Sequence, residues 1–211
     1  MTPGILDIPQ ILIKKGLPFA IYCLPFKKEF NLIFQKDIDV NEIDILDIDK
    51  TSGFAIGNFE SAQSGTIIMI KPDYIINEGD NLTDVLSFLD TLPNNGHYNF
   101  TDNYSISKTD YLDRARYLID ILKKEDLKKI VFSRVVQKKL KKELNFNQLL
   151  SMLKDKYNSA FINLFHLPGI GTWFGASPEA LFKKVDNYIV TDAMAGTQLI
   201  NEDTENITWP D

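Results

Sequence analysis

The stretch FGASPEALFKKVDNYIVTDAMAGT, residues 174–197, carries more recognisable pattern than any other part of the chain. Its middle predicts a β-hairpin. Ala180–Val185 and Tyr188–Ala193 are short, β-prone runs, and the two turn residues Asp186-Asn187 join them. One loop precedes this hairpin and another follows it, so the hairpin fixes the spacing of the two loops.

The two loops carry the candidate chemistry of this stretch. Glu179 follows Ser177-Pro178, and the proline restricts the backbone beside a carboxylate in a largely apolar neighbourhood. Ala195, Gly196 and Thr197 are small, so the main chain there can approach a ligand and donate N–H groups. Taken separately, a glutamate after Ser-Pro is commonly a solvated turn residue, and Ala-Gly-Thr is commonly only a turn. The functional interpretation therefore depends on a further motif upstream.

Composition limits the class of protein. The chain has 211 residues, 44% of them hydrophobic, which is enough to bury a core, and its formal net charge of −6 argues against a nucleic-acid partner. Cys23 is accompanied only by His97 and His166, which excludes an internal disulfide and a Cys/His zinc cluster. No run approaches the ~20 apolar residues of a membrane span. We therefore expect a soluble, cytoplasmic protein with no membrane partner.

Residues 1–105 are expected to form a β-rich scaffold portion without catalytic groups. Pro9–Lys15 predicts a helix with proline in its first turn, and Leu82–Leu89 predicts a short helix within a loop-rich region. Lys36–Asp49 is interpreted as an acidic connection. The predicted strands of this part are Phe19–Leu24, Phe30–Gln35, Phe54–Phe59 and Thr66–Lys71.

Residues 106–211 are expected to be the first, incomplete part of a catalytic domain. A helix is predicted to begin at Ser107 or Thr109 as N-cap. KKIVFSRVVQKKL then predicts an internal strand over about Lys129–Gln137, because both of its faces carry apolar residues. Lys129 opens this strand near a buried surface, and the alternative is a strand-end lysine whose charge reaches water. The apolar face predicted for the helix consists of Tyr111, Ala115, Leu118, Ile119 and Leu122.

Helices and strands are predicted between the segment KKIVFSRVVQKKL and the stretch 174–197. Asn145–Tyr157 predicts an amphipathic helix, and Ala160–Leu167 and Thr172–Gly175 predict strands on either side of a turn. His166, in the first of these strands, is interpreted as a hydrogen-bonded sheet residue, with a role as a base as the alternative.

Three blocks, KIVFSR, FGASPEAL and TDAMAGT, occur in this order and together resemble the signature blocks of the chorismate-utilising enzymes, closest to the isochorismate synthases. The similarity covers about Tyr111 to Thr197. The resemblance implies an α+β fold of layered, mainly antiparallel sheets with flanking helices, and an active site between these layers. It also implies chorismate as the small-molecule substrate.

The resemblance also implies a role for each matching residue. Lys129, at the start of KIVFSR, matches the base that activates water, and Glu179 matches the general acid. Gly196, flanked by Ala195 and Thr197, matches the glycine whose backbone contacts a substrate carboxylate. Adding water at C2 of chorismate and expelling the C4 hydroxyl requires such a base and acid. For these roles the pKa of a lysine has to fall from ~10.4 and that of a glutamate has to rise from ~4.3.

Two residues indicate water and not ammonia as the nucleophile. Ammonia-using anthranilate synthases commonly lack the lysine that is present here as Lys129, and aminodeoxychorismate synthases commonly carry lysine where this chain has Ala195. We therefore expect an isochorismate synthase, an isomerase of the hydroxymutase type, serving menaquinone or siderophore biosynthesis. Salicylate synthases share both features and eliminate pyruvate in a later step, so they remain the alternative enzyme.

The resemblance further implies Mg²⁺, held in this family by glutamates well downstream of Ala-Gly-Thr. Those blocks have no counterparts before the chain ends at NEDTENITWPD, so we expect no metal ligands here. We therefore also expect that the C-terminus is truncated and that this fragment is inactive although its parent enzyme is active. We further expect that the fragment self-associates through an exposed core. A non-catalytic half-domain is the alternative from a different class.

Overall fold

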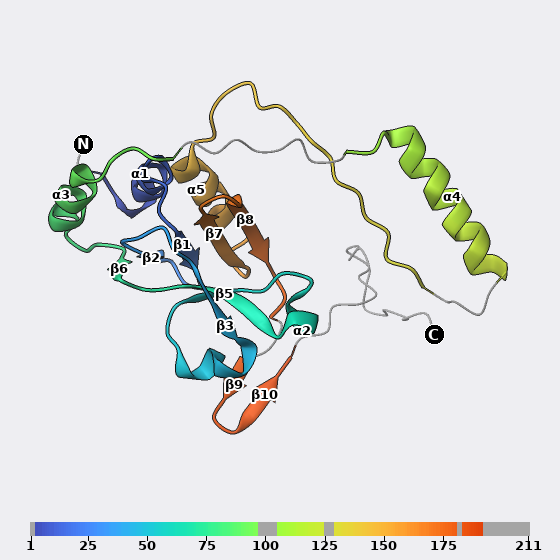
Figure 1. The fold of residues 1–211 in the computed structure, drawn as a ribbon, viewed down its shortest axis with the longest axis horizontal. Coiled ribbons are helices and arrows are strands. Elements are labelled where there is room, and N and C mark those ends of the chain that lie inside the picture. Colours follow the sequence, from blue (N-terminus) through green and yellow to red (C-terminus); the bar gives the residue numbers. More distant parts are fainter. Residues whose placement is uncertain (1–2, 97–104, 125–128, 181–182, 192–211) are drawn as a thin grey trace, which may run out of the picture. The chain divides into compact units, whose positions relative to one another are not determined.

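A central antiparallel sheet organises the larger of the two units into which the chain divides (Figure 1). The computed structural model describes residues 3–96, 105–124, 129–180 and 183–191. The first unit comprises residues 1–97 and 145–211, and the second unit comprises residues 98–144. Within the described ranges, no helix has the length and apolar character needed to cross a membrane.

The elements of the first unit follow one another as short strands and helices. In chain order they are η1 (Ile5–Asp7), α1 (Ile8–Lys15), β1 (Phe19–Cys23), β2 (Asn31–Phe34), β3 (Asn41–Asp44), η2 (Ile45–Lys50), β4 (Phe54–Ile56), α2 (Ser61–Ser64), β5 (Thr66–Ile70), β6 (Tyr74–Asn77), α3 (Thr83–Thr91), α5 (Phe146–Lys156), β7 (Phe161–Leu167), β8 (Gly171–Ser177), β9 (Lys183–Val185) and β10 (Tyr188–Val190).

The central sheet has the strand order β6-β2-β1-β7-β8, and each strand is antiparallel to its neighbours. β1 lies in the middle, where Ile21 is opposite Leu32 of β2 on one side and Leu164 of β7 on the other. Phe19, Ala20 and Ile21 are completely buried. A strand covered on both faces requires such a continuous apolar run, and this explains why β1 reads as FAIYC.

Each face of the central sheet packs against its own layer. On one face, Leu12 of α1, Leu89 of α3 and Leu150 of α5 complete a core with the odd-numbered residues of β1. On the other face, Ala20 packs with Ile70 of a second sheet, which has the order β3-β5-β4. These layers of helices and antiparallel sheets confirm the expected α+β fold.

Most elements predicted for the first unit are confirmed to within a few residues. The hairpin of β9 and β10 has Val185 opposite Tyr188, and Asp186 in its turn has a φ of 53°, as a tight two-residue connection requires. β3 and β6 were not predicted. Lys36–Asp49 is not only a connection, because Asn41–Asp44 within it pairs with β5 and thereby becomes a strand.

The second unit contains one long helix, α4 (Lys108–Lys124), followed by an extended segment. Ser107 is the N-cap, as predicted, since its hydroxyl accepts a hydrogen bond of 3.0 Å from the backbone N–H of Asp110. The Phe132 ring stacks on the Tyr111 ring of α4 with centroids 4.8 Å apart, and the Arg134 guanidinium lies 5.0 Å from the same ring. These contacts attach the segment to the helix.

The strand predicted over Lys129–Gln137 is wrong, because residues 129–140 form neither helix nor strand. Its side chains are not internal either, since Val131 is 85% exposed. A β-prone sequence becomes a strand only when another strand accepts its backbone hydrogen bonds. No described residue supplies that partner.

A buried glutamine joins the two sheets. Gln35 follows β2, is fully buried, and accepts a hydrogen bond of 2.9 Å from the backbone N–H of Lys71, just after β5. Its amide nitrogen donates to the carbonyl oxygen of Asp39 at 2.8 Å and to a carboxylate oxygen of Asp37 at 3.3 Å. The side chain of Gln35, at the end of β2 of the central sheet, therefore satisfies backbone groups that flank β3 and β5 of the second sheet.

We expect Gln35→Leu to lower the free energy of unfolding by about 1–3 kcal/mol, because the backbone groups of Lys71 and Asp39 lose their partners in two part-buried hydrogen bonds. Equilibrium denaturation in urea measures the change. Gln63→Leu is the matched control, since Gln63 is exposed and its replacement should change stability by less than about 0.5 kcal/mol. Equal effects of the two substitutions would contradict this role.

His166 lies on β7 within the core and is only 1% exposed. Its Nδ1 is 2.8 Å from the hydroxyl of Thr172 on β8, and its ring stacks on Phe19 of β1 with centroids 6.0 Å apart. Burial lowers the pKa of this imidazole from 6.5 to about 4. The geometry agrees with the interpretation of His166 as a hydrogen-bonded sheet residue.

We expect His166 to make the fold less stable in mild acid. The unfolded chain takes up a proton as the pH falls through 6.5, whereas the folded chain does so only near pH 4, so stability falls across this window. His166→Gln should remove that part of the pH dependence in denaturation curves. Thr172→Val should keep it, because the imidazole still titrates, and a His166→Gln protein with the parental pH slope would exclude the assignment.

Candidate functional site

Glu179 lies just beyond the end of β8. β8 pairs with β7 from Gly171 to Ser177, which fixes the strand up to two residues before the glutamate. The Ser177 hydroxyl then donates a hydrogen bond of 3.0 Å to the backbone carbonyl oxygen of Glu179 and holds the turn. The position of Glu179 therefore follows from the long β7–β8 ladder.

The environment of Glu179 differs from the apolar neighbourhood expected from sequence, because its side chain is exposed. The reason is topological. β8 is the edge strand of the central sheet, and Pro178 directs the chain out of the ladder, where no described layer covers it.

Lys129 opens the extended segment of the second unit, and its side chain is exposed. The predicted alternation is present only over residues 129–133, although the strand is not, and Arg134 departs from it because its side chain is exposed. Ile130 and Phe132 are partly buried, whereas Lys129 and Val131 are exposed. The expected burial near Lys129 is thus confined to its neighbours, whereas the side chain of the lysine itself is exposed.

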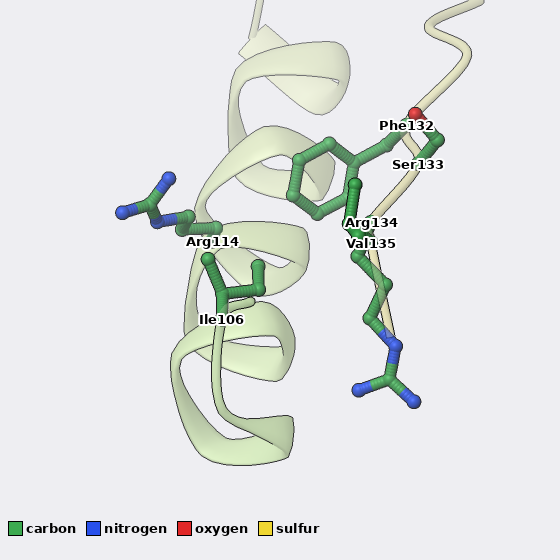
Figure 2. Close-up of a pocket in the computed structure, with 6 residues that line it drawn as sticks. All are labelled: Ile106, Arg114, Phe132, Ser133, Arg134 and Val135. Atoms are coloured by element: carbon green, nitrogen blue, oxygen red, sulfur yellow. The ribbon is translucent and has the colours of Figure 1, made fainter. Parts of the chain in front are cut away.

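The second unit also contains a cavity of about 270 Å³, which sequence reasoning did not predict (Figure 2). The Phe132 ring is turned toward α4, with Ile106 near it, while the guanidinium groups of Arg114 and Arg134 extend in different directions. The cavity therefore has apolar walls with positive charge at its rim. Its lining residues are Ile106, Arg114, Phe132, Ser133, Arg134 and Val135.

The sequence-predicted site residues are distributed over the chain. Lys129 belongs to the second unit and Glu179 to the first, so neither unit by itself contains both. Ala195, Gly196 and Thr197 lie outside the described residues. Arg114 and Ile106 were missed because a cavity wall made by one helix and one extended segment leaves no sequence motif.

A resident metal ion does not fit the residues that the structure describes. Within residues 3–96, 105–124, 129–180 and 183–191, no group of three or more His, Cys, Asp or Glu side chains is arranged to hold a metal.

The chain was compared with known proteins in three ways. A family model described as "Chorismate binding enzyme" matches residues 70–207, about two thirds of the chain. No curated protein sequence and no solved structure matches. The matched region includes Lys129, Glu179 and residues 195–197, which are the positions singled out by the three sequence blocks. The chain therefore belongs to the family of chorismate-binding enzymes.

Proposed function

We propose that this chain provides the general base and the general acid of an isochorismate synthase that acts in the cytoplasm. Membership of the chorismate-binding enzymes supports chorismate as the substrate. The observation that carries the narrower proposal is the presence of Lys129 at the start of the KIVFSR block, together with Ala195 in the third block. Both residues favour water over ammonia as the nucleophile.

The proposed reaction is an isomerisation in which the atoms balance. Lys129, in its neutral form, takes a proton from water while the water oxygen bonds to C2 of chorismate. The ring double bonds shift, the bond from C4 to its hydroxyl oxygen breaks, and Glu179 donates a proton to that leaving hydroxyl. The net change is the movement of one hydroxyl group from C4 to C2, and the displaced oxygen leaves as water.

The exposure of Lys129 and Glu179 sets a condition on this chemistry. A lysine acts as a base at neutral pH only when its pKa is lowered, and a glutamate acts as an acid only when its pKa is raised. Displacing water from the side chain produces both changes. Because both side chains are exposed in the described structure, bound chorismate or another covering element has to supply that desolvation.

Product analysis tests the proposed function. The intact gene product is incubated with chorismate and Mg²⁺, which the family resemblance implies, and the mixture is chromatographed. We expect isochorismate without pyruvate. Salicylate with pyruvate would assign the salicylate synthase reaction instead, and chorismate binding without any turnover would identify a non-catalytic module. The product, isochorismate, is a precursor for menaquinone or for siderophores.

We expect Lys129→Ala to lower the turnover of the intact gene product by roughly 10²–10⁴, the usual effect of losing a positioned base. Lys138→Ala is the control, because Lys138 is an exposed lysine of the same segment outside the three blocks. Steady-state rates of isochorismate formation measure both variants. Similar turnover of the two variants would show that the base is another group.

We expect Glu179→Gln to abolish product formation in both directions while chorismate still binds, because glutamine keeps the shape of the side chain but has no acidic proton to donate. Glu42→Gln, at an exposed position of β3, should leave the rate unchanged. Calorimetric binding and rate measurements on the same protein separate the two effects. Near-normal turnover of Glu179→Gln would place the acid elsewhere.

A further inference from the structure

The loop that follows α3 provides a cap for the C-terminal end of α1. The backbone N–H of Gly96 donates a hydrogen bond of 3.0 Å to the carbonyl oxygen of Lys14, in the last turn of α1. Four residues after Lys14 stands Pro18, which has no N–H and cannot act as the helical partner of this carbonyl. Gly96 therefore satisfies a backbone group that a continued helix could not satisfy.

Two further contacts hold the same loop, residues 92–96, against α1. The ammonium group of Lys15 donates a hydrogen bond of 2.6 Å to the carbonyl oxygen of Leu92. Gly96 also packs directly against the helix backbone, since a Cβ at this position would overlap the carbonyl oxygen of Ile13. The loop is thus attached at both of its ends, and only glycine fits position 96.

The glycine at position 96 follows an asparagine, and this pair is chemically labile. Asn95 is the only asparagine of the 211 residues that is followed directly by glycine. A backbone nitrogen can attack the side-chain amide carbon of the asparagine that precedes it, and a following residue without Cβ leaves this approach open. Asn95 is exposed, so water reaches its amide group.

We propose that Asn95 is a site of spontaneous deamidation and that the contact between Gly96 and α1 controls its rate. The Gly96 nitrogen bonds to Cγ of Asn95, and the bond from Cγ to Nδ2 breaks. The displaced nitrogen takes up the proton lost by Gly96 and leaves as ammonia. Water then opens the resulting succinimide ring at one of its two carbonyl groups. The product is aspartate or isoaspartate, and water is the only other reactant.

The folded structure opposes the first step of this reaction. The attacking nitrogen is the one whose N–H is bound to the Lys14 carbonyl, and the contact with the Ile13 carbonyl restricts rotation of Gly96. Attack therefore requires the loop 92–96 to open from the end of α1. Such a local opening occurs without unfolding of the core, so the reaction proceeds slowly in the folded chain.

The two products have different effects on the cap. Aspartate keeps the length of the backbone, whereas isoaspartate continues the chain through its side chain and adds one backbone atom before Gly96. The added atom displaces the Gly96 N–H from the Lys14 carbonyl. Leu12, in the same turn of α1, is completely buried, so fraying of this turn exposes apolar surface of the core. Isoaspartate at position 95 therefore destabilises the fold.

Prolonged incubation of the 211-residue chain at mildly alkaline pH tests the site. Peptide mass spectrometry should find aspartate and isoaspartate at position 95 of the folded chain. The chain unfolded in urea should react faster at the same position, because its Gly96 nitrogen is released from Lys14. An asparagine that stays intact at position 95, or equal rates in the folded and unfolded chains, would overturn the proposal.

Lys15→Met tests the control by α1, because it removes the hydrogen bond to Leu92 and keeps the apolar stem of the side chain. Deamidation of the folded chain should accelerate roughly 2–10-fold, the increase in open loop expected when one hydrogen bond of typical net strength is lost. Hydrogen exchange of the Gly96 amide should accelerate by the same factor. Lys14→Met is the matched control, since the side chain of Lys14 is exposed and only its backbone carbonyl belongs to the cap. Equal deamidation rates of the two variants would exclude the loop contacts as the controlling element.

Asn95→Asp separates the new charge from the added backbone atom. This variant should unfold at nearly the same urea concentration as the parent chain, whereas the purified isoaspartate form should unfold at a lower one. Equal urea midpoints of the isoaspartate form and the parent chain would show that the cap does not depend on the backbone before Gly96.

Discussion

The fold of the first unit depends on β1 being buried on both faces. Four of its five residues pair with β2, which follows closely in the chain, and all five pair with β7, which begins more than a hundred residues later. Burial of β1 on both faces is satisfied only when the helix layer and the second sheet are both in place. Formation of the core therefore requires residues before and after the second unit to assemble together, and this long-range pairing is a slow kind of contact to form.

The same pairing explains how the second unit is accommodated. Residues 98–144 lie in the sequence between α3 and α5 of the first unit. The central sheet nevertheless contains strands from both sides of this insertion, because β1 and β7 are hydrogen-bonded neighbours. An insertion at such a point leaves the core contacts of the host intact. The second unit is thus free to have its own internal organisation, in which Tyr111 of α4 fixes Phe132 and Arg134 of the segment that opens with Lys129.

Sequence patterns predicted the parts of this structure that local periodicity decides. The apolar runs of β1, β5 and β7 and the turn at Asp186-Asn187 specify their elements directly. β3 was missed because NEID is too polar to be recognised as a strand, and only its partner β5 makes it one. The opposite error occurred at residues 129–137, where a strongly β-prone sequence has no described partner. Hydrogen bonding across distant segments, as at Gln35, leaves no local pattern to find.

At the candidate site, too, the sequence motifs predicted which residues are present but not how exposed their side chains are. The three blocks identified the family and the residue types, since the reaction requires a base and an acid at fixed places in the chain. They did not predict the exposure of Glu179, which follows from β8 being the edge strand of the central sheet. The proposed reaction requires an uncharged lysine and an uncharged carboxylic acid, and displacing water from a side chain favours the uncharged form. In the proposed reaction, the reactivity of these two groups therefore depends on what excludes water from them when chorismate binds.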